Sequence, residues 1–155
     1  MENLIFLSLP LAGALHIFEE YVYPGGFAGA FKSLLPRASH LFTTNFHIVV
    51  NLAFYLLCVI GAIIGKSNLV LSLSVFGLIF TNGMLHIRGA LINRGYYPGV
   101  ITGLFIYRPL TIYAHYYFIN AGKLSWTEAV LSFILGVSYM VSLMIYVLVQ
   151  QRKEI

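Results

Sequence analysis

Long apolar runs, separated by short polar or glycine- and proline-containing connectors, dominate the chain. Five of these runs approach the roughly 20 residues that an α-helix needs to cross the hydrocarbon core of a bilayer. They cover residues 3–18, 41–65, 69–92, 99–121 and 126–149. The pattern predicts an all-α, polytopic transmembrane bundle of about five spans that forms one domain over residues 1–155. A cleaved signal peptide is the alternative for the first run, but Glu2 stands where such a peptide carries a basic residue.

The composition agrees with a surface that faces lipid. Hydrophobic residues make up 59% of the chain and charged residues 9%, against roughly 25% charged residues in soluble domains. A small chain this apolar cannot cover itself with polar groups, so we expect lipid to be its solvent. The basic residues behind the net charge of +4 are scattered, which argues against a nucleic-acid partner. The single cysteine, Cys58, cannot form an intrachain disulfide.

The charges of the connectors predict an orientation. If the N-terminus lies outside, the inner side carries five basic residues, Lys32, Arg37, Arg94, Arg152 and Lys153. The outer side then carries two, Lys66 and Lys123. By the positive-inside rule this asymmetry predicts N-out/C-in topology, and we expect a multi-pass protein of the cell (inner) membrane.

That topology brings polar residues of three runs to one depth, near the inner face. They are His16, Glu19 and Glu20 at the end of the first run, Thr44, His47 and Asn51 at the start of the second, and Asn82 and His86 near the end of the third. Ionisable groups at membrane depth cost roughly 2.5–3.5 kcal/mol each on insertion scales, so they usually mark a site that uses them. The convergence therefore predicts a polar site open toward the inner leaflet.

Helical spacing supports this site. On an α-helix, Glu20 lies about 40° from His16, and Glu19 lies about 60° to the other side. His47 and Asn51 are four residues apart and share one face of the second run, and the third run repeats this spacing. Each helix is thus expected to turn a single polar stripe toward the others.

The fourth run carries two further candidates. Arg108 falls near mid-membrane, where it could bind an anionic substrate group or pair with a glutamate. His115 falls about 24 Å from the inner end, counted from Gly99. It would join the site only if a kink at Pro109 or a tilt of the helix brought it back.

These residues and their order resemble the HXXEE-domain family of integral membrane proteins. The motif is present as His16-Ile-Phe-Glu19-Glu20 and continues as Tyr21-Val-Tyr-Pro24-Gly25-Gly26-Phe27. The elements Asn45/His47/Asn51, Asn82/His86 and Tyr97-Pro98-Gly99 extend the resemblance across nearly the whole chain. The family is described as of unknown function and suspected to be enzymatic. The resemblance thus indicates which residues matter and implies no substrate.

Three histidines and a carboxylate are a natural ligand set for zinc or a similar divalent metal. We predict His16, Glu20, His47 and His86 as metal ligands, and Glu19 or Glu20 as the general base on a metal-bound water. Orienting or substrate-binding roles are expected for the remaining candidates, Asn45, Asn51, Asn82, Arg108 and His115. The favoured function is a metal-dependent hydrolase or transferase that acts on a lipid or another hydrophobic substrate.

Several alternatives stay open at this point. A metal-free Glu/His hydrolase would resemble the CAAX-protease-like membrane peptidases, although the motif order differs and the arginine expected after the glutamate pair is missing. A haem protein could use His47 and His86 as axial ligands, whereas a diiron site needs more carboxylates than two. A small proton-coupled transporter or ion pathway is a third class. The histidines could also be interhelical hydrogen-bonding residues, and a homo-oligomer is compatible with each alternative.

Overall fold

A computed structural model describes residues 1–22, 26–34, 40–41 and 43–152. Within these residues the chain is all-helical, as the apolar runs predict. Four helices are long and apolar enough to cross a membrane, namely α1 (Glu2–Val22), α3 (Thr44–Ile64), α4 (Leu69–Asn93) and α7 (Trp126–Arg152). Shorter elements connect them, namely α2 (Gly26–Leu34), η2 (Gly65–Ser67), α5 (Val100–Thr102), η3 (Gly103–Tyr107) and α6 (Arg108–Asn120). Pro24, Gly25, Arg37 and Lys153, which entered the sequence argument, lie outside the described residues.

The fourth predicted run is helical from residue 100 to 120, but it is not one regular helix. Pro109 has no N–H to donate to the carbonyl of Phe105, four residues back. The chain widens instead into the π-helical turn η3, in which the Arg108 N–H bonds the carbonyl of Gly103, five residues back. This run is therefore absent from the four long helices, and the count of five spans and the N-out orientation stay predictions.

Local signals set the boundaries of the two central helices close to those expected. Thr43 caps α3, because its hydroxyl accepts from the Phe46 N–H at 3.2 Å. Asn68 caps α4 in the same way, with its side-chain oxygen 3.1 Å from the Leu71 nitrogen. At its other end α4 stops at Arg94, which takes the left-handed conformation with φ 51°.

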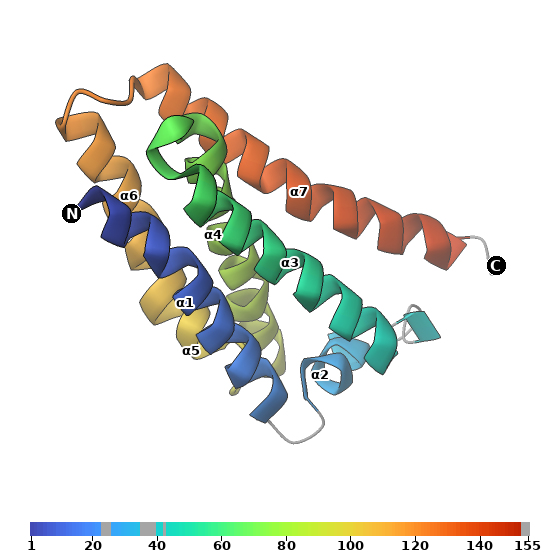
Figure 1. Ribbon diagram of the computed structural model, residues 1–155. Helices are drawn as coiled ribbons and strands as arrows, with labels where there is room; N and C mark the ends of the chain where they lie inside the picture. The colour runs from blue at the N-terminus through green and yellow to red at the C-terminus, as the bar shows by residue number, and fades with distance from the viewer. Residues whose placement is uncertain (23–25, 35–39, 42, 153–155) are drawn as a thin grey trace.

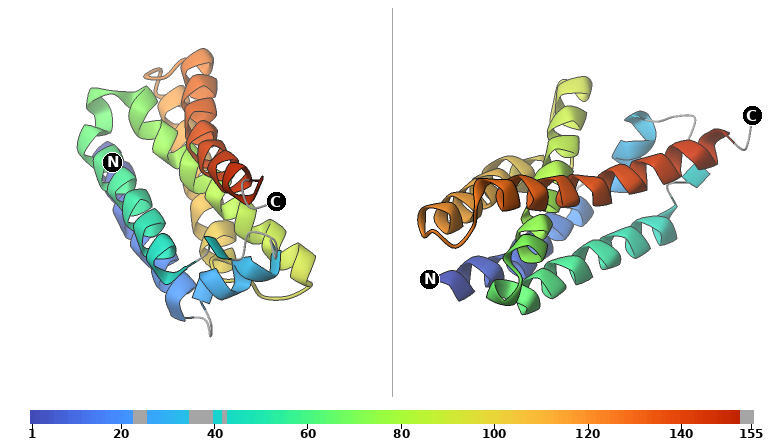
Figure 2. Two further views of the ribbon diagram at one scale, coloured as in Figure 1. Left: turned by 90° about the vertical axis from the view of Figure 1, so that its right-hand side faces the viewer. Right: turned by 90° about the horizontal axis from the view of Figure 1, so that it is seen from above.

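Helix α4 is the most buried of the four long helices and forms the centre of the bundle. Helix α1 runs beside α3, while α7 and the α5–η3–α6 segment pack on α4 (Figures 1 and 2). Glycines allow the closest crossings. A Cβ at Gly83 would lie 2.9 Å from the Cα of Gly103, and a Cβ at Gly136 would overlap the Ser74 carbonyl oxygen.

An aromatic contact determines how α1 and α4 are aligned along the bundle. Phe6 of α1 packs on Phe76 of α4 and on Phe118 of α6, with ring centroids 6.4 and 5.3 Å apart. Both helices run in the same direction from this contact (Figure 1). His16 lies ten residues after Phe6 on α1, and His86 lies ten residues after Phe76 on α4, which is about 15 Å along each helix. The packed aromatic end thus brings two distant histidines to the same level.

Candidate metal centre

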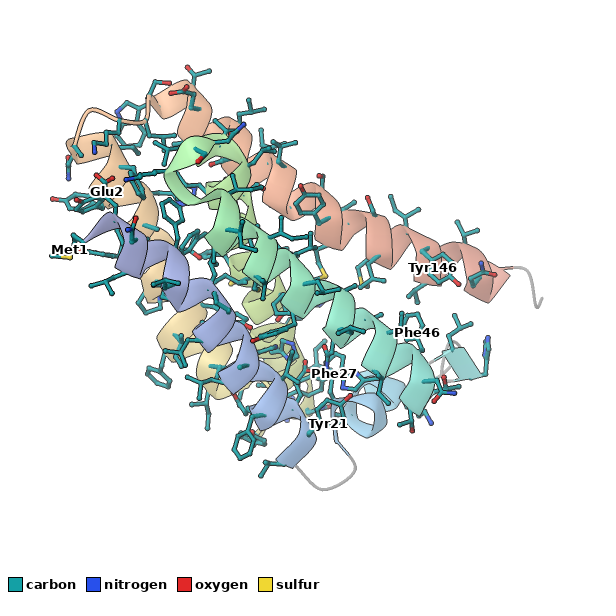
Figure 3. All side chains as sticks on the ribbon, viewed as in Figure 1. Met1, Glu2, Tyr21, Phe27, Phe46 and Tyr146 are labelled. Carbon is teal, nitrogen blue, oxygen red and sulfur yellow. The ribbon has the colours of Figure 1, made fainter. Side chains whose placement is uncertain are left out.

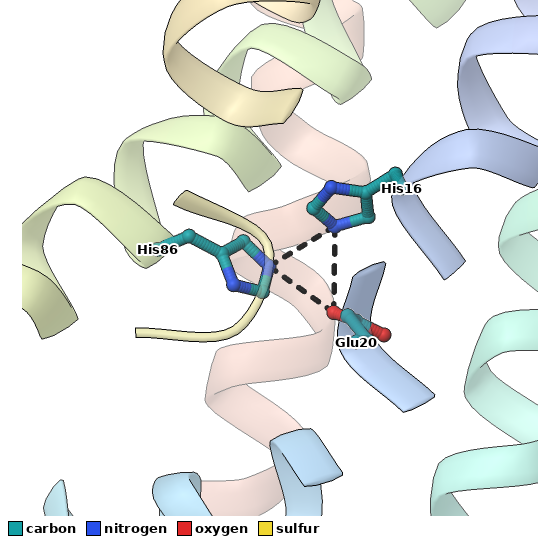
Figure 4. Close-up of side chains that lie close together, drawn as sticks. All are labelled: His16, Glu20 and His86. Carbon is teal, nitrogen blue, oxygen red and sulfur yellow. Dashed lines mark hydrogen bonds and ion pairs between the residues drawn. The ribbon is translucent and has the colours of Figure 1, made fainter. Parts of the chain in front are cut away.

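Two histidines and a glutamate meet where α1 and α4 reach the lower end of the bundle in Figure 1 (Figure 4). His16 and Glu20 come from consecutive turns of α1, and His86 comes from the last third of α4. The Nε2 atoms of the two imidazoles are 3.2 Å apart. Glu20 Oε1 lies 3.4 Å from His16 Nε2 and 3.3 Å from His86 Nε2. All three side chains are at most 2% exposed. Bulk water therefore does not solvate the carboxylate or the ring nitrogens.

The partners of the other ring nitrogens indicate the tautomer of each histidine. His86 Nδ1 bonds the carbonyl oxygen of Pro98, which can only accept, so this nitrogen carries the proton. His16 Nδ1 lies 2.6 Å from the hydroxyl of Thr102. That hydroxyl donates its one proton to Glu19 and therefore accepts from His16. In the neutral imidazoles both Nε2 atoms consequently turn a lone pair toward Glu20.

Two lone pairs and a carboxylate oxygen at this spacing repel one another unless positive charge lies between them. A metal ion, or a proton on one imidazole, would supply that charge. Tetrahedral zinc with nitrogen and oxygen ligands at about 2.0–2.1 Å holds its ligand atoms about 3.3–3.4 Å apart. The three distances of 3.2, 3.3 and 3.4 Å fit this arrangement. These residues could hold a metal ion in a buried three-ligand group.

The second oxygen of Glu20 faces α3. The Asn51 side-chain amide donates to Glu20 Oε2 at 2.7 Å and also lies 3.1 Å from His47 Nε2. His47 Nε2 is 3.6 Å from the same carboxylate oxygen. Asn51 therefore holds one oxygen of Glu20, while His47 lies beside the three-ligand group and not within it.

Glu19 faces the other side of α1. Its carboxylate accepts from the Thr102 hydroxyl and backbone N–H at 2.6 and 2.8 Å, and from the Ile101 N–H and the Tyr96 hydroxyl at 3.0 Å each. It thus binds the free N–H groups at the start of the α5–η3 helical segment. Within the described residues, Glu19 is linked to the centre through the Thr102 hydroxyl, which also bonds His16. The predicted role of Glu19 as a base receives no geometric support, because its oxygens are fully engaged elsewhere.

In the part of the chain that the structure describes, no hydrogen bond or ion pair joins the remaining sequence candidates to the three-ligand group. Asn45 is exposed at the start of α3. Arg108 lies over the ring of Phe80, 6.0 Å from its centroid. Asn82 lines the cavity described below, and its Oδ1 atom is buried without a hydrogen-bond partner among the described residues.

His115 belongs to a different polar contact, between α6 and α7. Its Nδ1 bonds the Thr111 carbonyl at 3.0 Å, and its Nε2 lies 3.1 Å from the Ser132 hydroxyl. The Thr111 hydroxyl donates to the carbonyl of Phe76, ten residues or about 15 Å before His86 on α4. The π-helical turn before Pro109 does not bring His115 back to the centre, so its position supports an interhelical hydrogen bond.

Thr102 and Gly99 are parts of the centre that the sequence argument did not identify as site residues. Gly99 takes φ +84°, and a Cβ there would lie 2.5 Å from His86 Nδ1 and 2.7 Å from His16 Cε1. The only signal in the sequence was the Tyr97-Pro98-Gly99 element of the family resemblance. Tyr97 is itself buried beside the centre, and burial together with the Glu20 charge raises the pKa of its hydroxyl, which therefore stays protonated.

A cavity of about 240 Å³ opens beside Glu20 between α3, α4 and α7. Its polar end is formed by Glu20, His47, Asn51, Asn82 and His86. Phe27 and Phe46, labelled in Figure 3, also line it. Apart from the Tyr139 hydroxyl, the rest of its wall is apolar. The candidate metal centre therefore has one side that a substrate could reach.

A family model for proteins of unknown function with an HXXEE motif matches residues 7–114, well over half of the chain. The chain belongs to this family. The family assignment from the sequence is thus confirmed, and the matched region contains all the residues that build the centre. Neither a curated protein nor a solved structure matches the chain. Within the HXXEE motif, His16 and Glu20 face the centre, whereas Glu19 accepts hydrogen bonds from Thr102.

We predict that Thr102→Val weakens zinc binding by about 10–100-fold, the range seen when a residue that orients a metal ligand is lost. Valine keeps the size of threonine but offers no oxygen to His16 Nδ1 or proton to Glu19. A competition titration with a chromogenic zinc chelator would measure the change. Thr102→Ser, which keeps the hydroxyl, should restore affinity, and equal affinities for valine and wild type would contradict the role of Thr102.

Proposed function

We propose that this protein is a metal-dependent membrane hydrolase or transferase that acts on a lipid or another hydrophobic substrate. His16 Nε2, His86 Nε2 and Glu20 would hold a divalent ion, with zinc favoured. The observation that supports this most directly is the set of distances of 3.2, 3.3 and 3.4 Å between His16 Nε2, His86 Nε2 and Glu20 Oε1. Octahedral iron with two histidines and one carboxylate on one face would hold its ligand atoms about 3.0 Å apart at similar bond lengths, which fits less well.

The ligand set also suits catalysis. Two histidines and a glutamate leave a fourth position of a tetrahedral zinc ion for water or substrate. When bound, such an ion lowers the pKa of water to about 7 and polarises a carbonyl or phosphoryl oxygen. Thr102 and Pro98 keep the protons of His16 and His86 on Nδ1, so that both Nε2 atoms stay available as ligands.

The residues between the centre and the cavity have the positions that proton transfer and orientation require. His47 lines the cavity and lies 3.6 Å from Glu20. We propose that His47 takes up the proton lost by the attacking group, in place of Glu19, whose oxygens are held by Thr102, Ile101 and Tyr96. Asn51 keeps Glu20 in place. Asn82 lies in the cavity wall, where its side-chain N–H groups would donate to a substrate oxygen.

The haem alternative finds less support in this arrangement. His47 and His86 both contact the Glu20 carboxylate, at 3.6 and 3.3 Å. A porphyrin between two axial histidines would have to displace that carboxylate. The cell (inner) membrane and the N-out orientation remain part of the proposal, because they would place the centre near the inner face.

The test is the metal and chromophore content of detergent-purified protein, measured by elemental mass spectrometry and a visible spectrum. We expect about one zinc per chain, and its loss from a His16→Ala/His86→Ala double variant. His115→Ala is the matched control and should keep the metal, because His115 bonds Ser132 away from the centre. Iron with a Soret band would replace the proposal with a redox protein. A folded wild-type protein that contains no metal and takes up none would overturn it.

A further inference from the structure

The cavity beside the candidate metal centre changes character along its length. On α3 its lining runs from His47 and Asn51 to Phe54 and Leu57, ten residues or about 15 Å from first to last. On α4 it runs from His86 back to Leu78, about 12 Å. Both helices thus give the cavity a polar end beside the candidate metal centre and an apolar end deeper in the membrane-spanning part of the bundle.

Helix α7 forms the opposite wall with aliphatic and thioether side chains. Met140, Leu143, Met144 and Val147 line the cavity from this helix, together with Tyr139 at its opening. Apart from the hydroxyl of Tyr139, these side chains carry no donor or acceptor that would orient a polar molecule along this wall. Methionine side chains are flexible and polarisable and adapt to chains of varied shape. The wall is therefore suited to hydrocarbon.

The cavity opens sideways, between α3 and α7. Ala53 of α3 and Tyr139 of α7 both line it and are also exposed on the outside of the bundle. Figures 1 and 2 show these two helices diverging in front of α4. Because both are among the helices long and apolar enough to cross a membrane, the opening would face acyl chains of the bilayer.

We propose that this cavity binds one acyl chain of an amphiphilic substrate, which enters from the bilayer between α3 and α7. Its volume of about 240 Å³ lies below the roughly 300–1,000 Å³ of pockets that enclose drug-sized ligands. Spread over some 12–15 Å, this volume suits one slender chain and excludes a pair of chains or a fused-ring lipid. The chain end would lie near Leu57 and Met140, and the polar end would meet Glu20 and His47.

The placement of the polar end rests on the proposed function, since it presents the reacting group to the candidate metal centre. Binding of the chain itself does not depend on metal. The test must therefore measure chain binding and metal content separately, in the same full-length protein.

The experiment uses a diazirine-bearing dodecanoic acid, photolysed with the protein in lipid nanodiscs, and maps adducts by mass spectrometry. We expect adducts on Phe54, Leu57 and Met140 that excess unlabelled dodecanoic acid suppresses. Adducts on Leu52, an exposed residue of α3 outside the cavity, should not be suppressible, because bulk lipid contact does not saturate. Adducts spread evenly over both faces of α3 would overturn the proposal.

Neighbouring valines of α3 provide a matched pair of variants. Val50 lines the cavity, whereas Val49 is 64% exposed and does not. Val50→Trp should lower saturable labelling by about tenfold, the effect of excluding roughly two methylene groups, and Val49→Trp should leave it unchanged. Equal labelling in the two variants would overturn the proposal. Should Val50→Trp not fold, the suppressible labelling pattern of the wild type decides alone.

Two further outcomes separate this inference from the proposed function. Saturable labelling retained in the His16→Ala/His86→Ala variant, or in wild type without metal, supports the acyl-chain site independently of the metal centre. Zinc present without saturable labelling leaves the metal centre intact and overturns the acyl-chain site. If a separate bifunctional cross-linker joins two copies through α3 and α7, and the probe gives no adducts there, the opening belongs to a second copy of the chain and the acyl-chain site is overturned.

Discussion

Glu20→Gln is expected to lower zinc affinity by about a hundredfold or more and to leave the metal-free protein at least as stable as wild type. Loss of a residue that only orients a ligand costs about 10–100-fold, so loss of the charged ligand itself should cost at least the upper value. Stability should not fall, because a buried carboxylate facing two lone pairs is unfavourable without a cation. Glutamine keeps the size of the side chain and an oxygen for Asn51.

The measurement is thermal unfolding with and without zinc, together with a zinc titration. At a zinc concentration a hundred times Kd, wild type should gain about 2.7 kcal/mol in unfolding free energy, and the variant should gain little. Glu2→Gln, the same change at the opposite end of α1, should bind zinc as wild type does, because Glu2 pairs with Lys123. Full metal content in Glu20→Gln would contradict the assignment of Glu20 as a ligand.

Glu19→Gln gives the comparison that separates the two adjacent glutamates. The amide of glutamine keeps one acceptor oxygen where the carboxylate accepts four hydrogen bonds, including two from backbone N–H groups. We expect the unfolding free energy to fall by about 1–3 kcal/mol, the cost of leaving such donors unpaired. Only Glu19→Gln is thus expected to lower the stability of the metal-free protein, and an equal loss in both variants would contradict their separate contacts.

Gly99→Ala is expected to lose the metal centre as well as stability. An L-residue other than glycine at a left-handed φ costs about 1–2 kcal/mol, and φ here is +84°. The new methyl group would also meet His86 Nδ1 and His16 Cε1 at 2.5 and 2.7 Å. Both imidazoles must move, which adds roughly 1–3 kcal/mol for overpacking and displaces the two Nε2 atoms from their shared position.

Gly122→Ala is the control that isolates backbone strain from the contact. Gly122 has φ +66°, yet a Cβ there meets nothing within 4 Å. We expect it to lose only the backbone cost of about 1–2 kcal/mol and to retain zinc, whereas Gly99→Ala should lose zinc. Thermal unfolding and elemental analysis measure both effects. Zinc retained in Gly99→Ala would show that the contact of Gly99 with His16 and His86 is not needed to hold the metal ligands in position.

Several features of this protein could be predicted from local sequence alone. Hydropathy is an additive property of neighbouring residues, so the apolar runs predict the long helices within a few residues of their ends. The four-residue spacing of His16 and Glu20 places both on one side of a helix wherever that helix packs. Depth in the membrane, inferred from the order of the runs, was enough to expect His86 near them.

The choice between Glu19 and Glu20 could not be predicted in this way. The two side chains are about 100° apart on α1, and His16 lies between them in angle. Either could face the other histidine. Packing decides the matter, because α3 and α4 cover one flank of α1 and the segment from Tyr96 to Thr102 covers the other.

The hydropathy of residues 99–121 likewise indicates one span, whereas the missing N–H of Pro109 and the π-helical turn before it break the run and leave His115 with Ser132. The roles of Thr102 and Gly99 depend on contacts across more than eighty residues with His16, and no local spacing records such contacts. Composition and helical period are therefore sufficient for the helices and for the polar stripe each one carries. Which of those polar atoms face one another depends on how the helices pack, because only packing brings side chains from α1, α4 and the connection after α4 within bonding distance.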